Sequence, residues 1–283
     1  RDRDNAEDMR PARFEYESAA DLPEAIAASA SGAVPLAGGQ SLLPALKRRQ
    51  RAAELLIDLG MLAELRGVER DSTGRLWIGA MTRHQELFRS SLVREFFPAL
   101  AEAASLIGDR QVRNRGTIGG NLCFADPRAN LPPMLIAARA SLRITSPGAE
   151  REVPVEALFR GTQQNTLAAG EIVSAVAVPC PAPLVSAYRE LAPQRQGVPI
   201  VNVAAAILPD GGVGVAAGGL GATPLRLSAV EGALTGERRR GAALDAFDAS
   251  RFSAMDDLHA SSQYRVRAGR VLLARALEAL EIG

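Results

Sequence analysis

Short apolar runs alternate with longer amphipathic stretches along the first part of the chain, a pattern that predicts short strands joined by helices. Val34 to Ala37 is the clearest strand, because it ends at Gly38-Gly39 and a helical stretch over 41–49 follows. Thr82 is predicted to be the N-cap of the next helix, and Pro132-Pro133 to open another. Further strands are predicted at residues 55–59, 76–80, 142–144 and 172–178.

The pattern changes beyond three closely spaced prolines, Pro179, Pro181 and Pro183, which predict a domain boundary. Asp210-Gly211-Gly212 lies between two apolar runs and is typical of a β-hairpin. We therefore predict an α+β unit with a three-stranded antiparallel sheet and a bundle of helices. Its strands are predicted at residues 185–191, 200–208 and 213–217, and its helices at 225–234, 244–249 and 264–280.

The size and composition are those of a folded protein with more than one domain. The chain has 283 residues, of which 47% are hydrophobic and 23% charged. A net charge of +1 and an aromatic content of 4% argue against nucleic acid as a partner. No apolar run is long enough to span a membrane, and Arg1 to Arg10 lacks the order of a signal peptide. We expect a cytoplasmic protein, and we leave the residues before Met9 out of the fold prediction.

Metal chemistry is not expected on this chain. Cys123 and Cys180 are too few for a four-cysteine zinc or iron–sulfur site, and we interpret both as small buried apolar residues in a reducing compartment. His84 and His259 are the only histidines, and His84, in a predicted first helical turn, is interpreted as structural. We find no nucleophile–base–orienter set and no paired carboxylates. We therefore predict no catalytic residues on this chain, as in a protein whose cofactor supplies the chemistry.

The first candidate binding motif is the segment Ala37, Gly38, Gly39, Gln40 and Ser41, where a predicted strand turns into a predicted helix. Glycine lets the backbone approach a ligand closely, and the N–H groups that follow suit a pyrophosphate. Ser41 is expected either to cap the helix or to bind a phosphate oxygen. The spacing is neither that of a Rossmann motif nor that of a P-loop, and a simple strand–helix turn is the structural alternative.

A second glycine loop runs from Gly116 to Asn121 and is followed by Ala125-Asp126-Pro127. It adds a hydroxyl group at Thr117 and an amide at Asn121. Either loop alone is weak evidence and is compatible with a structural turn. Together, two such loops predict a grip on a long dinucleotide at separate points, with backbone amides of both facing the diphosphate.

In this order and spacing, the segments resemble the flavoprotein (medium) subunit of the molybdenum hydroxylases, a family that includes carbon monoxide dehydrogenase and xanthine dehydrogenase. The resemblance covers nearly the whole chain. The matching segments are Arg10-Pro-Ala-Arg-Phe-Glu-Tyr, Leu56-Ile-Asp-Leu, Ile78-Gly-Ala-Met-Thr, Gln111-Val-Arg-Asn-Arg-Gly-Thr-Ile-Gly-Gly-Asn, Tyr264-Arg and Arg270-Val-Leu-Leu-Ala-Arg-Ala-Leu.

The resemblance implies an α+β fold in which two subdomains of the PCMH type, 9–62 and 63–178, hold FAD and a C-terminal domain, 179–283, follows. The FAD is expected to be bound without a covalent link, because neither glycine loop contains a histidine or cysteine. The residues implied to contact FAD are Ala37, Gly38, Gly39, Gln40, Ser41, Thr117, Gly119, Gly120, Asn121, Asp126, Asn130 and, through its backbone, Val173.

The resemblance also implies an electron-transfer role within a larger complex. Electrons are expected to pass from a molybdenum cofactor on a large subunit, through [2Fe–2S] clusters on a small subunit, to this FAD and on to an external acceptor. The complex is expected to be a dimer of such heterotrimers. The organic substrate and the acceptor are not specified by this chain.

Three positions depart from the family pattern. Asn130 stands where an acidic residue that binds ribose hydroxyls is usual. A lysine usual near Tyr188 is replaced by Arg189 or Glu190, and Gly197-Val198-Pro199 offers no aromatic to cover the flavin. These departures leave a flavin-free scaffold subunit as an alternative. A self-sufficient flavin reductase, such as the enolpyruvyl reductase of cell-wall synthesis, is a third possibility, but no acid and base residues for it are identified.

Two groups of arginines remain. Arg110, Arg113 and Arg115 precede the second glycine loop and are expected to face the FAD phosphates, to face the iron–sulfur subunit, or to form a solvated basic turn. The run Arg238-Arg239-Arg240 is interpreted as a solvated loop.

Overall fold

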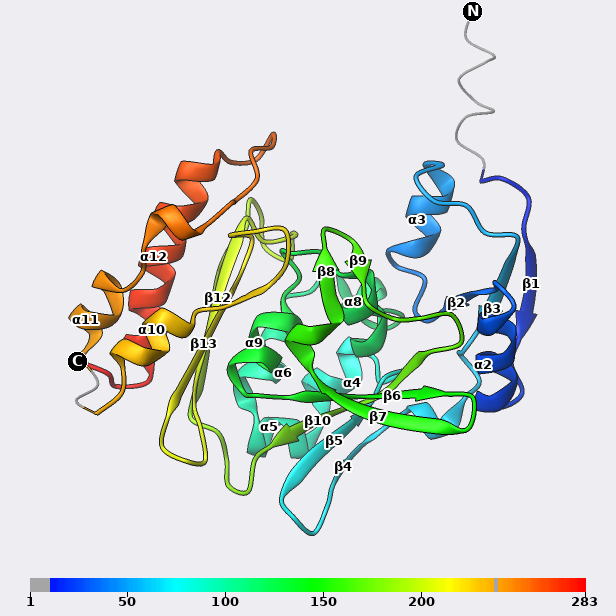
Figure 1. Ribbon diagram of the computed structural model, residues 1–283, viewed down its shortest axis with the longest axis horizontal. Coiled ribbons are helices and arrows are strands. Elements are labelled where there is room, and N and C mark those ends of the chain that lie inside the picture. Colours follow the sequence, from blue (N-terminus) through cyan, green and yellow to red (C-terminus); the bar gives the residue numbers. More distant parts are fainter. Residues whose placement is uncertain (1–10, 237–238) are drawn as a thin grey trace, which may run out of the picture.

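The computed structural model describes residues 11–236 and 239–283. Three larger sheets follow one another along the chain and across the molecule (Figure 1), and a further sheet has only two strands. The main buried clusters extend across the boundaries between the larger sheets. Arg238 of the predicted solvated loop lies outside the described residues.

The N-terminal sheet is small and entirely parallel, in the strand order β1-β3-β2. Its strands are β1 (Glu15–Ser18), β2 (Val34–Leu36) and β3 (Leu55–Asp58). Helix α2 (Leu22–Ala30) connects β1 to β2; Asp21 caps it by accepting a hydrogen bond from the N–H of Glu24. Helix α3 (Leu42–Lys47) connects β2 to β3. Because the strands are parallel, the ends of β2 and β3 lie at the same edge of the sheet.

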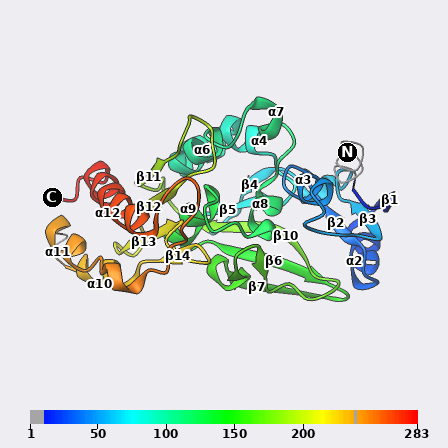
Figure 2. The same ribbon diagram turned by 90° about the horizontal axis from the view of Figure 1, so that it is seen from above.

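The middle domain is an antiparallel sheet of order β4-β5-β10-β6-β7, with helices on one face (Figure 2). Apolar side chains of β5, β6 and β10 form one core with those helices. The strands are β4 (Val68–Arg70), β5 (Arg75–Gly79), β6 (Ser141–Ser146), β7 (Ala149–Pro154) and β10 (Ile172–Pro179), and β8 (Phe159–Gly161) pairs separately with β9 (Gln164–Asn165). The helices are α4 (His84–Arg89), α5 (Ser91–Phe96), α6 (Pro98–Ser105), α7 (Arg110–Arg113), α8 (Ile118–Phe124) and α9 (Leu131–Ala137).

The other face of the middle sheet carries Trp77. The guanidinium groups of Arg75 and Arg143 lie 4.4 and 4.0 Å from the centre of its ring system. Its Nε1–H donates to Asp71. The bond from the Thr73 hydroxyl, together with those from Trp77 and the Arg75 backbone, holds the pKa of the Asp71 carboxyl well below its usual range. These contacts fix an aromatic side chain on the face of this sheet that carries no helix in the described part of the chain.

The C-terminal sheet, β11-β12-β13-β14, is enclosed by helices of two domains. Helix α12 (Ser262–Ala279) covers one face, and α9 and α6 of the middle domain contact the other (Figures 1 and 2). Nearly every residue of the two central strands is buried, as expected of strands covered on both faces. The strands are β11 (Ser186–Leu191), β12 (Val201–Ile207), β13 (Val213–Gly218) and β14 (Leu225–Arg226), and the shorter helices are α10 (Ser228–Ala233) and α11 (Arg240–Asp245).

The predicted α+β architecture is confirmed, including the β12–β13 hairpin, although three local expectations were wrong. Thr82 does not cap α4; it is buried, and its hydroxyl exchanges hydrogen bonds with the backbone of Gly67, so that Arg83 takes the N-cap position. Residues 225–226 add a fourth strand to the sheet, and only the following residues form α10. The helix predicted at 244–249 lies earlier, at α11.

Because α9 and β13 pack closely, we expect a methyl group added at Gly214 to lower the stability of the fold strongly. A Cβ on Gly214 would lie 1.9 Å from the carbonyl oxygen of Ala137. We expect Gly214→Ala to lower the free energy of unfolding by about 2 kcal/mol or more, because two packed backbones must separate. Gly232 of α10 has no atom within 4 Å of such a Cβ. Gly232→Ala is the matched control and should stabilise by roughly 0.5–1 kcal/mol, measured by urea unfolding.

Candidate functional site

The two glycine loops touch each other. A Cβ on Gly38 would lie 2.2 Å from the carbonyl oxygen of Arg115 and 2.7 Å from the Cα of Gly116. A Cβ on Gly120 would lie 3.3 Å from the Cβ of Ala37. The loops are therefore within reach of one dinucleotide, and only glycine at position 38 allows this approach.

The first loop leaves its backbone donors available. Within the described residues, no acceptor is bound by the N–H groups of Gly38, Gly39, Gln40 or Ser41. Gly39 has a φ of +72°, in the left-handed region, which turns the chain between β2 and α3. Ser41 occupies the N-cap position of α3 but makes no capping hydrogen bond, so the first of its two expected roles is wrong. A run of free amides of this kind suits an anion.

The second loop behaves differently from what we expected. Its N–H groups at Ile118, Gly119 and Gly120 donate to Thr82 O, Ala80 O and Thr117 Oγ1, at 3.0, 2.8 and 3.1 Å. The expectation that backbone amides of both loops face a diphosphate is therefore wrong for this loop. Thr117 caps α8 instead, and Gly119 allows the helix to approach Ala80 at the end of β5.

In the second loop, the side chain of Asn121 has a hydrogen-bond acceptor without a partner among the described residues. Its Oδ1 is buried and has no hydrogen-bond partner within the described residues. An unpaired buried acceptor costs about 1–3 kcal/mol, so it marks a position where a donor from a bound group would be stabilising. Free amides in one loop and a free acceptor in the other are a polar set that fits the phosphates and hydroxyl groups of a dinucleotide.

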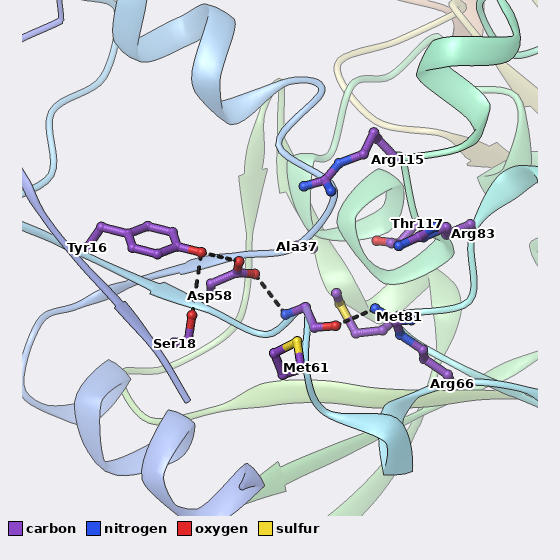
Figure 3. A pocket seen from close by; sticks show the side chains of 11 residues that line it. Tyr16, Ser18, Ala37, Asp58, Met61, Arg66, Met81, Arg83, Arg115 and Thr117 are labelled. Atoms are coloured by element: carbon purple, nitrogen blue, oxygen red, sulfur yellow. Dashed lines mark hydrogen bonds between the residues drawn. The ribbon is translucent and has the colours of Figure 1, made fainter. Parts of the chain in front are cut away.

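A pocket of about 330 Å³ opens beside the two loops, between the N-terminal sheet and the middle domain (Figure 3). Ala37 of the first loop and Thr117 of the second both line it. The remaining lining residues are Tyr16, Ser18, Asp58, Gly60, Met61, Arg66, Met81, Arg83 and Arg115.

One wall of the pocket is a chain of hydrogen bonds at Asp58, which the sequence analysis missed. The hydroxyl of Tyr16 donates to Asp58 Oδ2 at 2.5 Å, and the N–H of Gly60 donates to Oδ1 at 2.7 Å (Figure 3). Asp58 ends β3 beside β2, the strand that leads into Ala37. The signal was present, because polar residues at the carboxyl ends of neighbouring parallel strands meet at one edge.

The opposite wall is basic. Arg66, Arg83 and Arg115 line the pocket against the single carboxylate of Asp58, an excess that favours an anionic ligand. Of the three arginines before the second loop, only Arg115 lines this pocket. Arg113 is bound internally, to Gln85 and to the carbonyl oxygens of Ile107 and Gly108.

Two of the remaining expected contact residues, Asp126 and Asn130, lie where the middle domain meets the C-terminal sheet. The third, Val173, lies at the start of β10, next to Ile172 of the N-terminal core. Asp126 accepts two hydrogen bonds from the Arg128 guanidinium and one from the Arg128 N–H. Asn130 is 5% exposed, and its Nδ2 donates to Glu190 at 2.6 Å. Val173 is buried in β10, beside the bulge at Ser174. None of these three lines the pocket beside the loops.

His84 packs directly under the second loop. Its backbone N–H donates to Gly116 O. A Cβ on Gly116 would lie 2.8 Å from the His84 imidazole. Burial, with the charge of Arg113 as the smaller cause, lowers the pKa of His84 to about 4. The side chain is therefore neutral at pH 7, which agrees with the structural interpretation.

The sequence profile of the FAD binding domain in molybdopterin dehydrogenase matches residues 12–181. The chain belongs to this family. Residues 186–280 match the CO dehydrogenase flavoprotein C-terminal domain.

Individual relatives match the chain over part or nearly all of its length. The alpha subunit of the 6-hydroxypseudooxynicotine dehydrogenase complex of Paenarthrobacter nicotinovorans is 32% identical over 95% of both chains. The carbon monoxide dehydrogenase medium chain of Hydrogenophaga pseudoflava is 42% identical over 60% of each. A solved structure of carbon monoxide dehydrogenase from the same organism superposes with a TM-score of 0.90 at 35% identity, covering 96% of this chain and 99% of that one.

The chain is thus an FAD-binding medium subunit of the molybdenum hydroxylase type and part of an oxidoreductase, as the resemblance implied. In the ranges 11–236 and 239–283, no helix is long and apolar enough to cross a bilayer. Both cysteines are free, Cys180 buried and Cys123 half-buried.

The buried His84 predicts a stability change with pH. A histidine whose folded pKa is lowered stabilises the fold above its unfolded pKa of about 6.5, and that stability is lost as the pH falls toward the folded pKa. From pH 7 to pH 4 we expect this group to remove about 3 kcal/mol from the free energy of unfolding. His84→Gln should flatten that part of the pH profile, whereas His259→Gln should leave it in place. Equal slopes in both variants would contradict the assignment.

Proposed function

We propose that this chain binds one FAD without a covalent link between its two glycine loops and relays electrons through it. The contact of Gly38 with Arg115 and Gly116 supports this most directly, because it places free backbone amides beside the second loop. Bound FAD supplies both one-electron and two-electron chemistry. The protein's task is to hold it, to shield its charge and to fix its position.

The residues divide that task. The N–H groups of Gly38 to Ser41 and the guanidinium of Arg115 bind the diphosphate, and Thr117 lies beside them in the pocket wall. Asn121 Oδ1 accepts a hydrogen bond from the cofactor, which satisfies an otherwise unpaired buried atom. Tyr16 and Asp58 close the other side of the same pocket. Asp126 and Asn130 remain proposed contacts on the side of the C-terminal domain, and Val173 remains a proposed contact at the start of β10.

The electron path runs through partner subunits. We place the molybdenum cofactor on a large subunit and two [2Fe–2S] clusters on a small subunit, which reduce this FAD; an external acceptor then oxidises it. The support is the set of relatives, named as medium chains or as subunits of dehydrogenase complexes, and a solved carbon monoxide dehydrogenase described by its Mo-pyranopterin cofactor. A dimer of heterotrimers in the cytoplasm completes the proposal.

The first test is the visible spectrum of the purified chain after reconstitution with FAD. We expect a yellow protein with about one FAD per chain, because free amides and a free acceptor meet in one site. A colourless chain that takes up no FAD would instead support the flavin-free scaffold. Turnover of an organic substrate by the isolated chain would support the self-sufficient reductase.

Gly38→Ala tests the apposition of the loops. Its Cβ would collide with backbone of the second loop, so we expect FAD affinity to fall by about tenfold or more, equivalent to about 1.4 kcal/mol. Gly161→Ala is the matched control, since the nearest atom to its Cβ is 3.5 Å away, an ordinary contact. Fluorescence titration of FAD with each variant measures the difference. Equal affinities would place the cofactor elsewhere.

Asn121→Ala separates binding from folding. The substitution removes a buried acceptor that has no partner in the described structure, so the stability of the FAD-free chain should stay the same or rise. FAD affinity should fall by about tenfold, because the hydrogen bond to the cofactor is lost. Thermal melting without FAD and titration with FAD provide the two readouts. Loss of stability without loss of affinity would refute the role given to Asn121.

A further inference from the structure

Asn130, one departure from the family pattern, meets Glu190, which is one of the two candidate positions for another departure. Asn130 at the start of α9 and Glu190 on β11 are 60 residues apart in sequence, yet Asn130 Nδ2 lies 2.6 Å from Glu190 Oε2. The same oxygen accepts from the hydroxyl of Tyr188 at 2.9 Å. An amide of the middle domain, a carboxyl group and a phenol of the C-terminal domain thus form one cluster at the domain junction.

The cluster is enclosed. Tyr188 is 1% exposed and Asn130 is 5% exposed. Burial, with the charge of Glu102 as a smaller contribution, raises the pKa of Glu190, whereas the bonds from Tyr188 and Asn130 oppose the rise. Polar groups in such surroundings adopt the orientation that satisfies their hydrogen bonds, since the alternative leaves a buried group unpaired.

The neighbouring backbone is tied to the same sheet. Asn202, which pairs with Glu190 in the β11–β12 register, donates from Nδ2 to the carbonyl oxygens of Arg128 and Ala129. The N–H of Gly219 donates to Pro127 O at 2.8 Å. Segment 126–130 therefore takes its shape from the C-terminal sheet.

Glu190 decides which end of the Asn130 amide faces outward. A carboxylate only accepts hydrogen bonds, so it selects the NH₂ end of the amide. The carbonyl oxygen, Oδ1, is then turned away from Glu190, and among the described residues nothing donates to it. Asn130 is thereby set up as an acceptor for a hydroxyl group.

We propose that Glu190 is a positioning residue of the FAD site, which holds Asn130 Oδ1 toward a hydroxyl group of the cofactor from the C-terminal domain. The inference rests on the proposed FAD binding and on Asn130 belonging to that site. It makes the C-terminal domain a part of the cofactor site, through a residue that need not touch the cofactor itself.

The test uses substitutions that differ in donor and acceptor character. Glu190→Gln keeps an acceptor for Asn130 and Tyr188, so FAD affinity should stay within about threefold of the wild type. Glu190→Lys offers only donors and satisfies the amide in the opposite orientation, which turns its NH₂ group outward. FAD affinity should then fall by about tenfold, as expected for one lost hydrogen bond.

The double variant Asn130→Asp with Glu190→Lys provides the rescue. The carboxylate introduced at position 130 would accept from the lysine and from a cofactor hydroxyl together, so affinity should return to within about threefold of the wild type. Asn130→Asp alone would set two carboxylates in contact and should bind FAD weakly. FAD titration of the full chain, with melting temperatures recorded without FAD, covers all four variants.

The outcomes are distinct. The positioning role is supported if FAD affinity depends on whether residue 190 donates or accepts hydrogen bonds, and if the double variant regains affinity. Affinities that follow the melting temperatures, or a Glu190→Lys variant that binds FAD as the wild type does, overturn it and leave the proposed function intact. A wild-type chain that takes up no FAD overturns both.

Discussion

The close contact between the backbone at Gly38 and the backbone at Arg115–Gly116 is the constraint on which the rest depends. It brings the end of β2, in the parallel sheet, against the start of α8, which belongs to the domain of the antiparallel sheet. No side chain at position 38 is compatible with this distance. The pocket, the free amides and the buried acceptor of Asn121 all lie around that single approach.

The two loops contribute unequally, although their sequences look alike. In the first loop, the glycines leave donors free. In the second, Gly119 lets a helix approach β5 and Thr117 closes its first turn, so the side chain of Asn121 becomes the available group. Glycine-rich composition therefore indicates close approach, but whether the approaching group is a ligand or another strand depends on the surrounding fold.

Much of this could be predicted from local patterns. The strands at Val34, Leu55, Leu76 and Ile172 and the β12–β13 hairpin follow from apolar runs bounded by turn residues. Other features depend on partners distant in sequence. Thr82 binds Gly67 rather than capping a helix, Tyr16 reaches Asp58, and Asn130 meets Glu190. Residue type predicts that a hydroxyl or amide will find a partner, but only the tertiary fold decides which one.

The setting of Trp77 has a practical consequence. It is the only tryptophan of the chain, and two guanidinium groups contact its ring on the face of the middle sheet that carries no helix among the described residues. Its emission therefore reports the integrity of that sheet alone, without signal from either flanking domain. Loss of order at the domain junction, with the central sheet intact, would therefore be silent in tryptophan fluorescence.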